Sequence, residues 1–115
     1  MTNSPETLRV VREVDHPAIR MQLDIGSLII NNEEISVLLP QCASLIGHVH
    51  VSEPGLVPIG DCETDHAKMA NFLNIYLPNH LATIEMLATK AEPHCTSIAR
   101  SLDLCTFNYR KERLL

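Results

Sequence analysis

The stretch Ile-Gly-His-Val-His-Val, residues 46–51, places two histidines at alternate positions among apolar residues, which predicts a β-strand. Two further runs, at residues 20–24 and 82–86, separate polar from apolar side chains in the same way. Successive side chains of a strand point to opposite faces, so each run gives its strand one polar and one apolar face. A potential metal ligand stands at or near the end of each run, namely Asp24, His50 and Glu85.

The size and charge of the chain narrow the possible classes of protein. Its 115 residues have room for a single domain, and a hydrophobic content of 45% with 20% charged residues is typical of a globular protein. The net charge of −5 argues against a nucleic-acid partner, because phosphate binding requires clustered Lys and Arg. The basic residues at 110–113 are interpreted as a solvated terminus.

The lack of recognisable targeting signals and the spacing of the cysteines predict a cytoplasmic protein. No apolar run has the length of about 20 residues that spans a bilayer, so no membrane partner is expected. The first residues lack the basic and apolar regions of a signal peptide. The four cysteines show no metal-binding spacing, which favours reduced and mostly structural thiols. Cys62 stands in a predicted loop, where a reactive thiol is an open alternative.

Helical and extended segments alternate along the chain. Ser-Pro-Glu at 4–6 predicts a helix start, because a hydroxyl cap, a proline at the first position and an early acid favour it. That helix ends at His-Pro, 16–17. The elements expected next are a strand at 18–25, a turn at Gly26-Ser27, a short helix from 31–34 to Pro40, a strand at 46–51 and a loop at 52–62. They are followed by a helix from Thr64 to about Leu77, a strand at 81–86 and a helix after Pro93. The expected core stripe of the last helix is Cys95, Ile98, Ala99 and Leu102. This order is typical of a parallel sheet with crossover helices.

The polar strand faces favour a barrel over an open sheet. Parallel strands covered on both faces read as continuous apolar runs, whereas these strands carry several polar groups on one face. In a (β/α)8 TIM barrel the inner face can become polar at the carboxyl ends of the strands, where active sites form. Three strands cannot close a barrel. The predicted fold class is therefore α/β, half of a TIM barrel, with residues 1–115 as one partial domain.

Three segments also resemble a known family. Gln-Leu-Asp-Ile-Gly-Ser at 22–27, the stretch from Gly47 to Asp61 and Ala-Thr-Ile-Glu-Met at 82–86 resemble the C-terminal half of sugar phosphate isomerases/epimerases. These belong to the xylose isomerase-like TIM-barrel superfamily. The resemblance covers nearly the whole chain and implies a divalent metal ion at the mouth of the barrel.

The resemblance also implies roles for particular residues. Asp24, His50 and Glu85 correspond to the second, third and fourth metal ligands of the family, and Glu85 would double as a general acid/base. Oxygen and nitrogen ligands of this kind suit Mn, Mg, Co or Zn, and the sequence does not favour one of these ions over the others. The family's first glutamate has no counterpart here. Ser27 stands where many relatives have a histidine, and the loop after His50 contains no Arg.

Several of these residues also have ordinary structural interpretations. Asp24 can instead be a strand-end acid that caps the following turn. His48 is expected to form a hydrogen bond inside the barrel or to contact the substrate. Glu53 is either a substrate-facing loop residue or an exposed acid, and His66 is expected to be solvated in the first turn of its helix. Arg20 is expected to pair with a carboxylate of the adjoining strand, because a buried charge needs a partner.

Three functions are consistent with this sequence. The first is a metal-dependent sugar or sugar-phosphate isomerase/epimerase, in which two chains form a homodimer through their open sheet edges and close an eight-stranded barrel. The second is a non-catalytic, truncated barrel fragment that folds as an oligomer, which the start of the chain after the strand of the first ligand favours. A third, DNA repair by analogy with the endonuclease branch of the superfamily, is opposed by the acidic charge.

Overall fold

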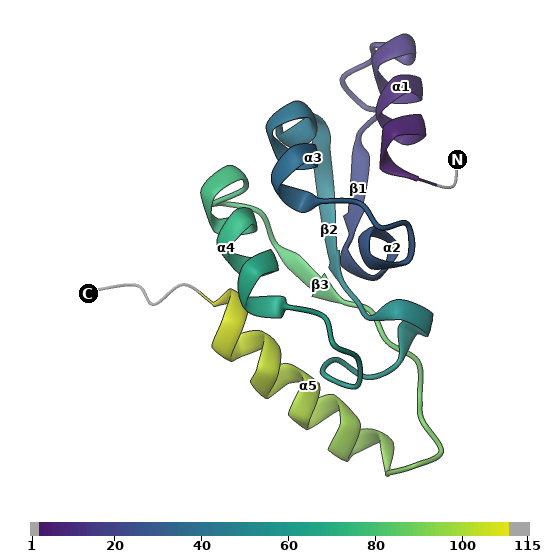
Figure 1. Cartoon of the computed structure of the whole chain (residues 1–115), viewed down its shortest axis with the longest axis vertical. Helices are drawn as coiled ribbons and strands as arrows, with labels where there is room; N and C mark the ends of the chain where they lie inside the picture. The colour runs from purple at the N-terminus through teal and green to yellow at the C-terminus, as the bar shows by residue number, and fades with distance from the viewer. Residues whose placement is uncertain (1–2, 111–115) are drawn as a thin grey trace, which may run out of the picture.

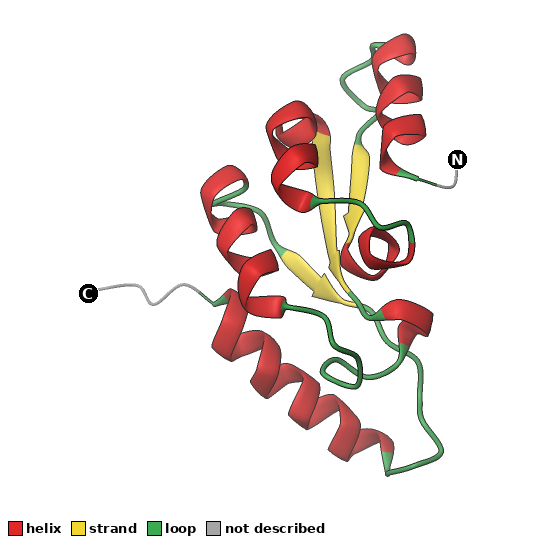
Figure 2. Cartoon of the chain, in the orientation of Figure 1, coloured by secondary structure: helices red, strands yellow, loops and turns green. Residues whose placement is uncertain are grey.

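The computed structural model describes residues 3–110, which form three parallel strands and five α-helices (Figures 1 and 2). The elements in chain order are α1 (Ser4–Val14), β1 (Met21–Asp24), α2 (Ile25–Ile30), α3 (Ile35–Cys42), the 3-10 turn η1 (Ala43–Leu45), β2 (Ile46–Val51), the 3-10 turn η2 (Pro54–Leu56), α4 (His66–Tyr76), β3 (Ala82–Ile84) and α5 (His94–Tyr109). The predicted alternation of strands and helices is confirmed.

The three strands form one parallel sheet in the order β1-β2-β3. Asp24 pairs with His50, and His50 pairs with Thr83, so the carboxyl ends of the strands lie at the same edge of the sheet. β1 and β3 are shorter than the predicted runs at 18–25 and 81–86. Among the described residues, β1 and β3 each pair with β2 alone, so each strand has hydrogen bonds along one edge only.

One face of the sheet carries the core. Met21, Leu23, Val49 and Val51 are buried beneath the helices, whereas Gln22 and His48 on the other face are exposed. Figure 1 shows α1, α3, α4 and α5 following one another beside the sheet, with α1 at one end and α5 at the other. A sheet with helices along its apolar face and a polar second face is the arrangement expected of part of a TIM barrel.

The helix α2 is an element that the sequence analysis did not predict. The turn expected at Gly26-Ser27 is instead the first turn of this helix, because the Asp24 side chain caps it. Gly26 is required there by close packing: a Cβ at this position would lie 2.7 Å from the carbonyl oxygen of Glu53. A larger residue could not bring the end of β1 so close to the end of β2.

Two helix starts and the predicted end of α3 also differ. Asn3 caps α1 in place of Ser4, and Asp65 caps α4 in place of Thr64. The Thr64 hydroxyl instead donates to the carboxylate of Glu53. The helix α3 continues through Pro40 to Cys42.

The packing face of α5 is the largest difference from the predicted helices. The helix packs against α4, and its buried residues are the small Ser97, Ser101 and Cys105. The predicted core stripe is wrong, since Cys95 and Ala99 are exposed and Ile98 and Leu102 are about half-exposed. The apolar side of α5 therefore has no cover among the described residues, as expected for a helix that flanks an unclosed sheet.

Candidate metal centre

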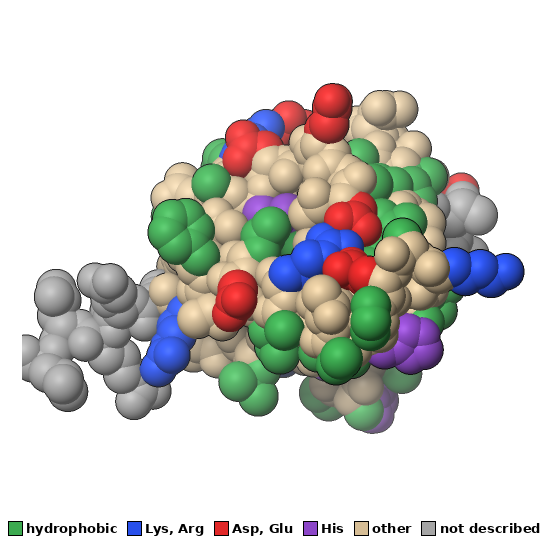
Figure 3. Space-filling view, turned by 90° about the horizontal axis from the view of Figure 1, so that it is seen from below, with side chains coloured by type: hydrophobic (Ala, Val, Ile, Leu, Met, Phe, Trp, Pro, Cys, Tyr) green, Lys and Arg blue, Asp and Glu red, His purple; other side chains and the backbone are tan. Residues whose placement is uncertain are grey.

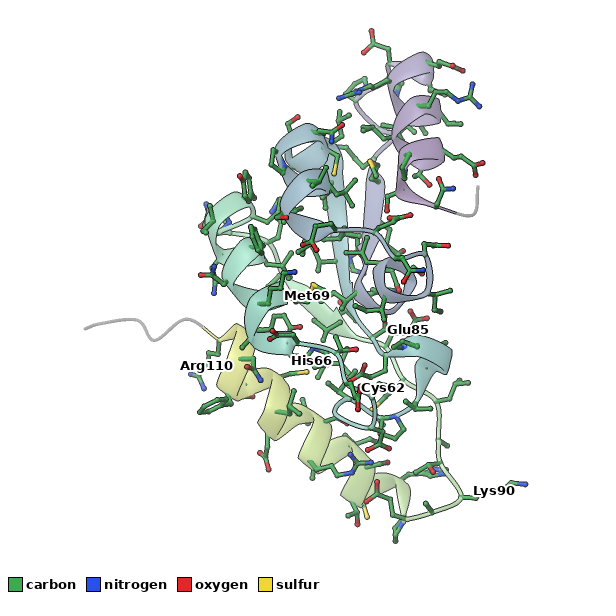
Figure 4. The ribbon with its side chains drawn as sticks, in the orientation of Figure 1. Cys62, His66, Met69, Glu85, Lys90 and Arg110 are labelled. Atoms are coloured by element: carbon green, nitrogen blue, oxygen red, sulfur yellow. The ribbon has the colours of Figure 1, made fainter. Side chains whose placement is uncertain are left out.

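The strand register brings the three predicted ligands together. Asp24 and His50 are direct neighbours on β1 and β2. Glu85 follows β3 two positions after Thr83, the partner of His50, and so returns to the same face of the sheet. Its backbone N–H donates to the carbonyl of Val51 at 3.0 Å, which extends the ladder past the end of the strand. Figure 4 shows Glu85 at this end of β3.

The ligand atoms of Asp24, His50 and Glu85 all lie within 4.8 Å of one another. The Nδ1 atom of His50 is 2.8 Å from Oε2 of Glu85 and 3.8 Å from Oδ2 of Asp24. The side chains of Asp24 and His50 are each 18% exposed, and that of Glu85 is 42% exposed. Glu85 is therefore the member of the group that solvent or a ligand reaches most easily.

The two carboxylate oxygens of Asp24 have different neighbours. Oδ1 accepts from the Ser27 N–H at 2.7 Å, which caps α2, and from the Ser52 hydroxyl at 3.0 Å. Oδ2 faces His50. The structural role as a helix cap thus leaves one carboxylate oxygen for a ligand.

Two neighbours complete the surroundings of His50. The Nε2 atom of Gln22 lies 2.9 Å from His50 Nδ1. The ring of His48 meets the ring of His50 edge to face with centroids 4.6 Å apart, and His48 is exposed on the polar face of the sheet. The predicted hydrogen bond of His48 inside the barrel is not among those the structure shows, so His48 is a candidate for contact with a bound molecule.

The charges of this group fit a divalent cation. Two carboxylate oxygens and a ring nitrogen converge on one point, and lone pairs that face each other require a proton or a cation between them. Ligand atoms bound to one ion at bonds of about 2.1 Å lie about 3–4 Å apart, close to the separations from His50 Nδ1. With three protein ligands, the remaining coordination positions of such an ion would be open to water or substrate.

The prediction that Glu53 is a substrate-facing or exposed acid is wrong. Glu53 is only 1% exposed. Its Oε1 accepts from the Gly60 N–H at 2.9 Å and lies 2.8 Å from His66 Nε2, while Oε2 accepts from the Thr64 hydroxyl. The carboxylate is buried because the loop folds around it and satisfies both oxygens.

His66 is also buried, contrary to the prediction of a solvated side chain. It begins α4, and its Nδ1 lies 2.6 Å from the hydroxyl of Tyr109 at the end of α5 (Figure 4). Burial raises the pKa of Tyr109, so the phenol stays protonated and can donate to Nδ1. The Nε2–H of His66 is then available to donate to Glu53. Because Tyr109 lies 43 residues after His66, no local sequence pattern signals this network.

Two other predictions are corrected by the observed contacts. Arg20 does not pair with a carboxylate of the adjoining strand; its guanidinium donates to the backbone carbonyl of Ser44 at 2.8 Å. The pKa of the Cys62 thiol is raised, first by desolvation and then by the charges of Glu53 and Asp61. A raised pKa lowers the thiolate fraction, which argues against a reactive Cys62.

The solved structures similar to this chain are sugar epimerases. A D-psicose 3-epimerase in the presence of D-fructose is 13% identical, with a TM-score of 0.76, and the match covers 95% of this chain and 44% of that chain. The D-psicose 3-epimerase of Clostridium cellulolyticum H10 with D-tagatose is 15% identical, with a TM-score of 0.79 and the same coverage. A 3-keto-D-glucoside 4-epimerase from E. coli is 17% identical, with a TM-score of 0.76, and the match covers 90% of this chain and 40% of that chain.

These matches confirm the predicted fold, part of a TIM barrel, and show that the chain is similar in fold to sugar epimerases. The chain spans less than half the length of each of these structures. No family model and no curated protein sequence matches it. Among residues 3–110, no helix is long and apolar enough to cross a membrane.

Proposed function

We propose that this chain carries the metal-binding part of a sugar isomerase or epimerase that transfers a proton next to a carbonyl group. The observation that carries this proposal is the convergence of Asp24, His50 and Glu85 at the carboxyl ends of three parallel strands. Active sites of TIM barrels form at that end of the strands. The epimerase activity of the similar solved structures supports the same reading.

Each residue of the group has a distinct proposed role. Asp24 and His50 are the less exposed members and would hold the ion in place. Glu85, the most exposed, would both bind the ion and accept or return the substrate proton. A divalent ion (Mn, Mg, Co or Zn) would supply charge stabilisation for the oxygens of the sugar. Two carboxylates and one imidazole do not determine which of these ions binds.

The proposed substrate is a sugar or sugar phosphate. D-fructose and D-tagatose appear with two of the similar epimerases, and the hydroxyl groups of such ketoses suit the polar face of the sheet that carries His48 and His50. His48 is proposed to contact the substrate, because it is exposed on the same face as His50 and touches its ring. A nucleic-acid substrate is not proposed. The surface in Figure 3 mixes acidic, basic and apolar side chains, with no broad basic patch among the coloured residues of that face.

A closed barrel requires more strands than this chain supplies. The expectation that two copies close an eight-stranded barrel is wrong in number, because two sheets of three strands give six. The exposed edges of β1 and β3 still favour association with further strands, and we propose a homo-oligomer joined along these edges. The cytoplasmic location expected from the sequence stays a prediction.

The alternative is a non-catalytic barrel piece. The share of the similar epimerases that the match covers, between 34% and 44%, supports it. Such a piece would bind a metal ion without turning over a sugar. The two functions therefore differ in turnover and share the metal site.

Calorimetric titration with Mn²⁺ and Zn²⁺, followed by ketose epimerisation assays, tests the proposal. We expect the unmodified chain to bind one ion, and His50→Gln and Glu85→Gln to weaken binding at least about 10-fold by removing a ligand. His94→Gln is the control, because His94 is exposed at the start of α5, away from the group. Turnover lost in Glu85→Gln supports the enzyme, and metal binding without turnover supports the alternative. Equal binding by all variants contradicts the metal site.

A further inference from the structure

Ser52, the residue after β2, connects the ends of two strands. It is fully buried, and its hydroxyl donates to Oδ1 of Asp24 at 3.0 Å. The hydroxyl oxygen of Ser52 also accepts from the Gly26 N–H at 2.9 Å. A buried hydroxyl with one donor and one acceptor partner has a single preferred orientation.

This contact fixes the rotation of the Asp24 carboxylate. Oδ1 receives two hydrogen bonds, from Ser52 and from the Ser27 N–H. With Oδ1 held on that side, Oδ2 is directed toward Nδ1 of His50. The orientation of the proposed ligand oxygen is thus set by a residue outside the ligand group.

Ser52 is itself held in place by its neighbour Glu53. The side chain of Glu53 is anchored by Gly60, Thr64 and His66, which belong to the loop after η2 and to the start of α4. On its other side the Ser52–Glu53 segment packs directly on Gly26, where a Cβ would lie 2.9 Å from Ser52 Oγ. The segment is therefore fixed both by the buried carboxylate and by the backbone at the start of α2.

We propose that Ser52 is a positioning residue for the metal ligand Asp24, with the buried Glu53 as its anchor. This inference rests on the proposed function, because it assigns a purpose to the orientation of Asp24. It also explains why a carboxylate is buried three residues after His50: the anchor fixes the segment that carries the positioning hydroxyl.

Ser52→Ala removes the hydroxyl, and Ser101→Ala is a matched control. Ser101 is also fully buried and accepts one backbone N–H, that of Ile59 at 3.1 Å, but it lies on α5. Both variants leave one buried N–H without an acceptor, so their general effects on folding are comparable. Two quantities are measured: Mn²⁺ affinity by calorimetry, and amide hydrogen exchange of Ser27 and Ile59 in the metal-free chain.

We expect Ser52→Ala to weaken Mn²⁺ binding about 10- to 100-fold, as is typical when a partner of a metal ligand is lost. Exchange of the Ser27 amide becomes faster in this variant, because Asp24 no longer holds one orientation. Ser101→Ala speeds exchange at Ile59 and leaves Mn²⁺ affinity and Ser27 unchanged. Equal Mn²⁺ affinity and equal Ser27 exchange in the two variants overturn the proposal.

The amide measurement separates failure of this inference from failure of the proposed function. If the unmodified chain binds no Mn²⁺, the metal function fails, and the Ser27 exchange rates alone decide whether Ser52 positions Asp24. If Ser52→Ala does not fold, Ser52→Cys replaces it, since a thiol of similar size is a weaker donor. This variant is expected to lose part of the Mn²⁺ affinity or Ser27 protection, and full retention of both contradicts the positioning role.

Discussion

The two carboxylate oxygens of Asp24 have different roles in the proposed site: one caps a helix, and the other is the proposed metal ligand. One oxygen caps α2 through the Ser27 N–H, and the other faces His50. A helix cap needs only an acceptor, whereas a metal ligand also needs charge. The two roles can therefore be separated by substitution at this single position.

Asp24→Asn and Asp24→Ala should differ in stability and agree in metal binding. The asparagine side chain keeps an acceptor for the Ser27 N–H, so the free energy of unfolding of the Asp24→Asn variant should stay close to that of the unmodified chain. The alanine variant should lose about 1 kcal/mol, the usual cost of a missing cap. Both should bind Mn²⁺ more weakly. Urea unfolding and calorimetry measure the two quantities, and equal stability of the variants would show that the cap contributes nothing.

The loop between β2 and α4 is held by buried polar groups. Glu53 and His66 form an ion pair or hydrogen bond in which the side chains are 0% and 4% exposed. Removing His66 leaves the buried Glu53 carboxylate with fewer hydrogen bonds, and a hydrogen bond to a buried charged group contributes more than one between neutral groups.

Substitutions in this network should therefore follow an order of severity. His66→Ala is expected to lower the free energy of unfolding by about 1.5–3 kcal/mol, because it removes one of the hydrogen bonds to the buried Glu53 carboxylate. Tyr109→Phe removes one hydrogen bond to His66 and should cost about 1 kcal/mol. Denaturant unfolding measures both. A loss in His66→Ala no larger than in Tyr109→Phe would contradict the buried network.

Arg100 joins the same loop to α5 by contacts at the surface. Its guanidinium donates to both oxygens of Asp61, at 2.7 and 2.9 Å, and this contact lowers the pKa of Asp61 from its ordinary value of 3.8. A carboxyl group with a lowered pKa in the folded state adds stability above pH 3.8, and this is lost as the pH falls through the lowered value. The effect is modest because both side chains are more than a third exposed.

Arg100→Gln should remove this acid-dependent contribution. The variant is expected to be slightly less stable than the unmodified chain at neutral pH, with a difference that shrinks as the pH falls below 3.8. Urea unfolding of both proteins at a series of pH values measures the difference. A gap that stays constant down to pH values well below the ordinary pKa of Asp61 would show that another contact of Arg100 is responsible.

The elements differ in how far sequence predicts them. β2 and the shared position of Asp24, His50 and Glu85 follow from strand periodicity, which is a local signal. The helix α2 was missed because its start depends on a cap by the last residue of β1. The inward turn of Glu53 and the packing face of α5 depend on contacts over long sequence separations, which periodicity does not contain.

At the scale of the whole molecule, the structure is an unclosed part of a barrel. Large apolar side chains remain uncovered along β3 and α5: Leu81 and Phe107 are each 87% exposed, and Ile98 and Leu102 are about half-exposed. Strand edges and apolar surface of this kind favour association.

We therefore expect the chain to form oligomers at micromolar concentration. Light scattering during size-exclusion chromatography measures the mass in solution, and a mass above that of one chain is predicted. Leu102→Glu places a charge on the half-exposed side of α5 and should shift the mass toward a single chain, whereas Asn71→Glu at an exposed position of α4 serves as the control. A well-folded monomer of the unmodified chain would contradict the proposed association.

The central claim is that strands β1, β2 and β3 direct one acid, one imidazole and one acid to a common ion. Anomalous diffraction from crystals grown with Mn²⁺ tests it most directly. We predict a single peak about 2.0–2.3 Å from Asp24 Oδ2, His50 Nδ1 and Glu85 Oε2. A map with no peak there, in which His50 and Glu85 remain in direct hydrogen-bond contact at saturating Mn²⁺, would contradict it.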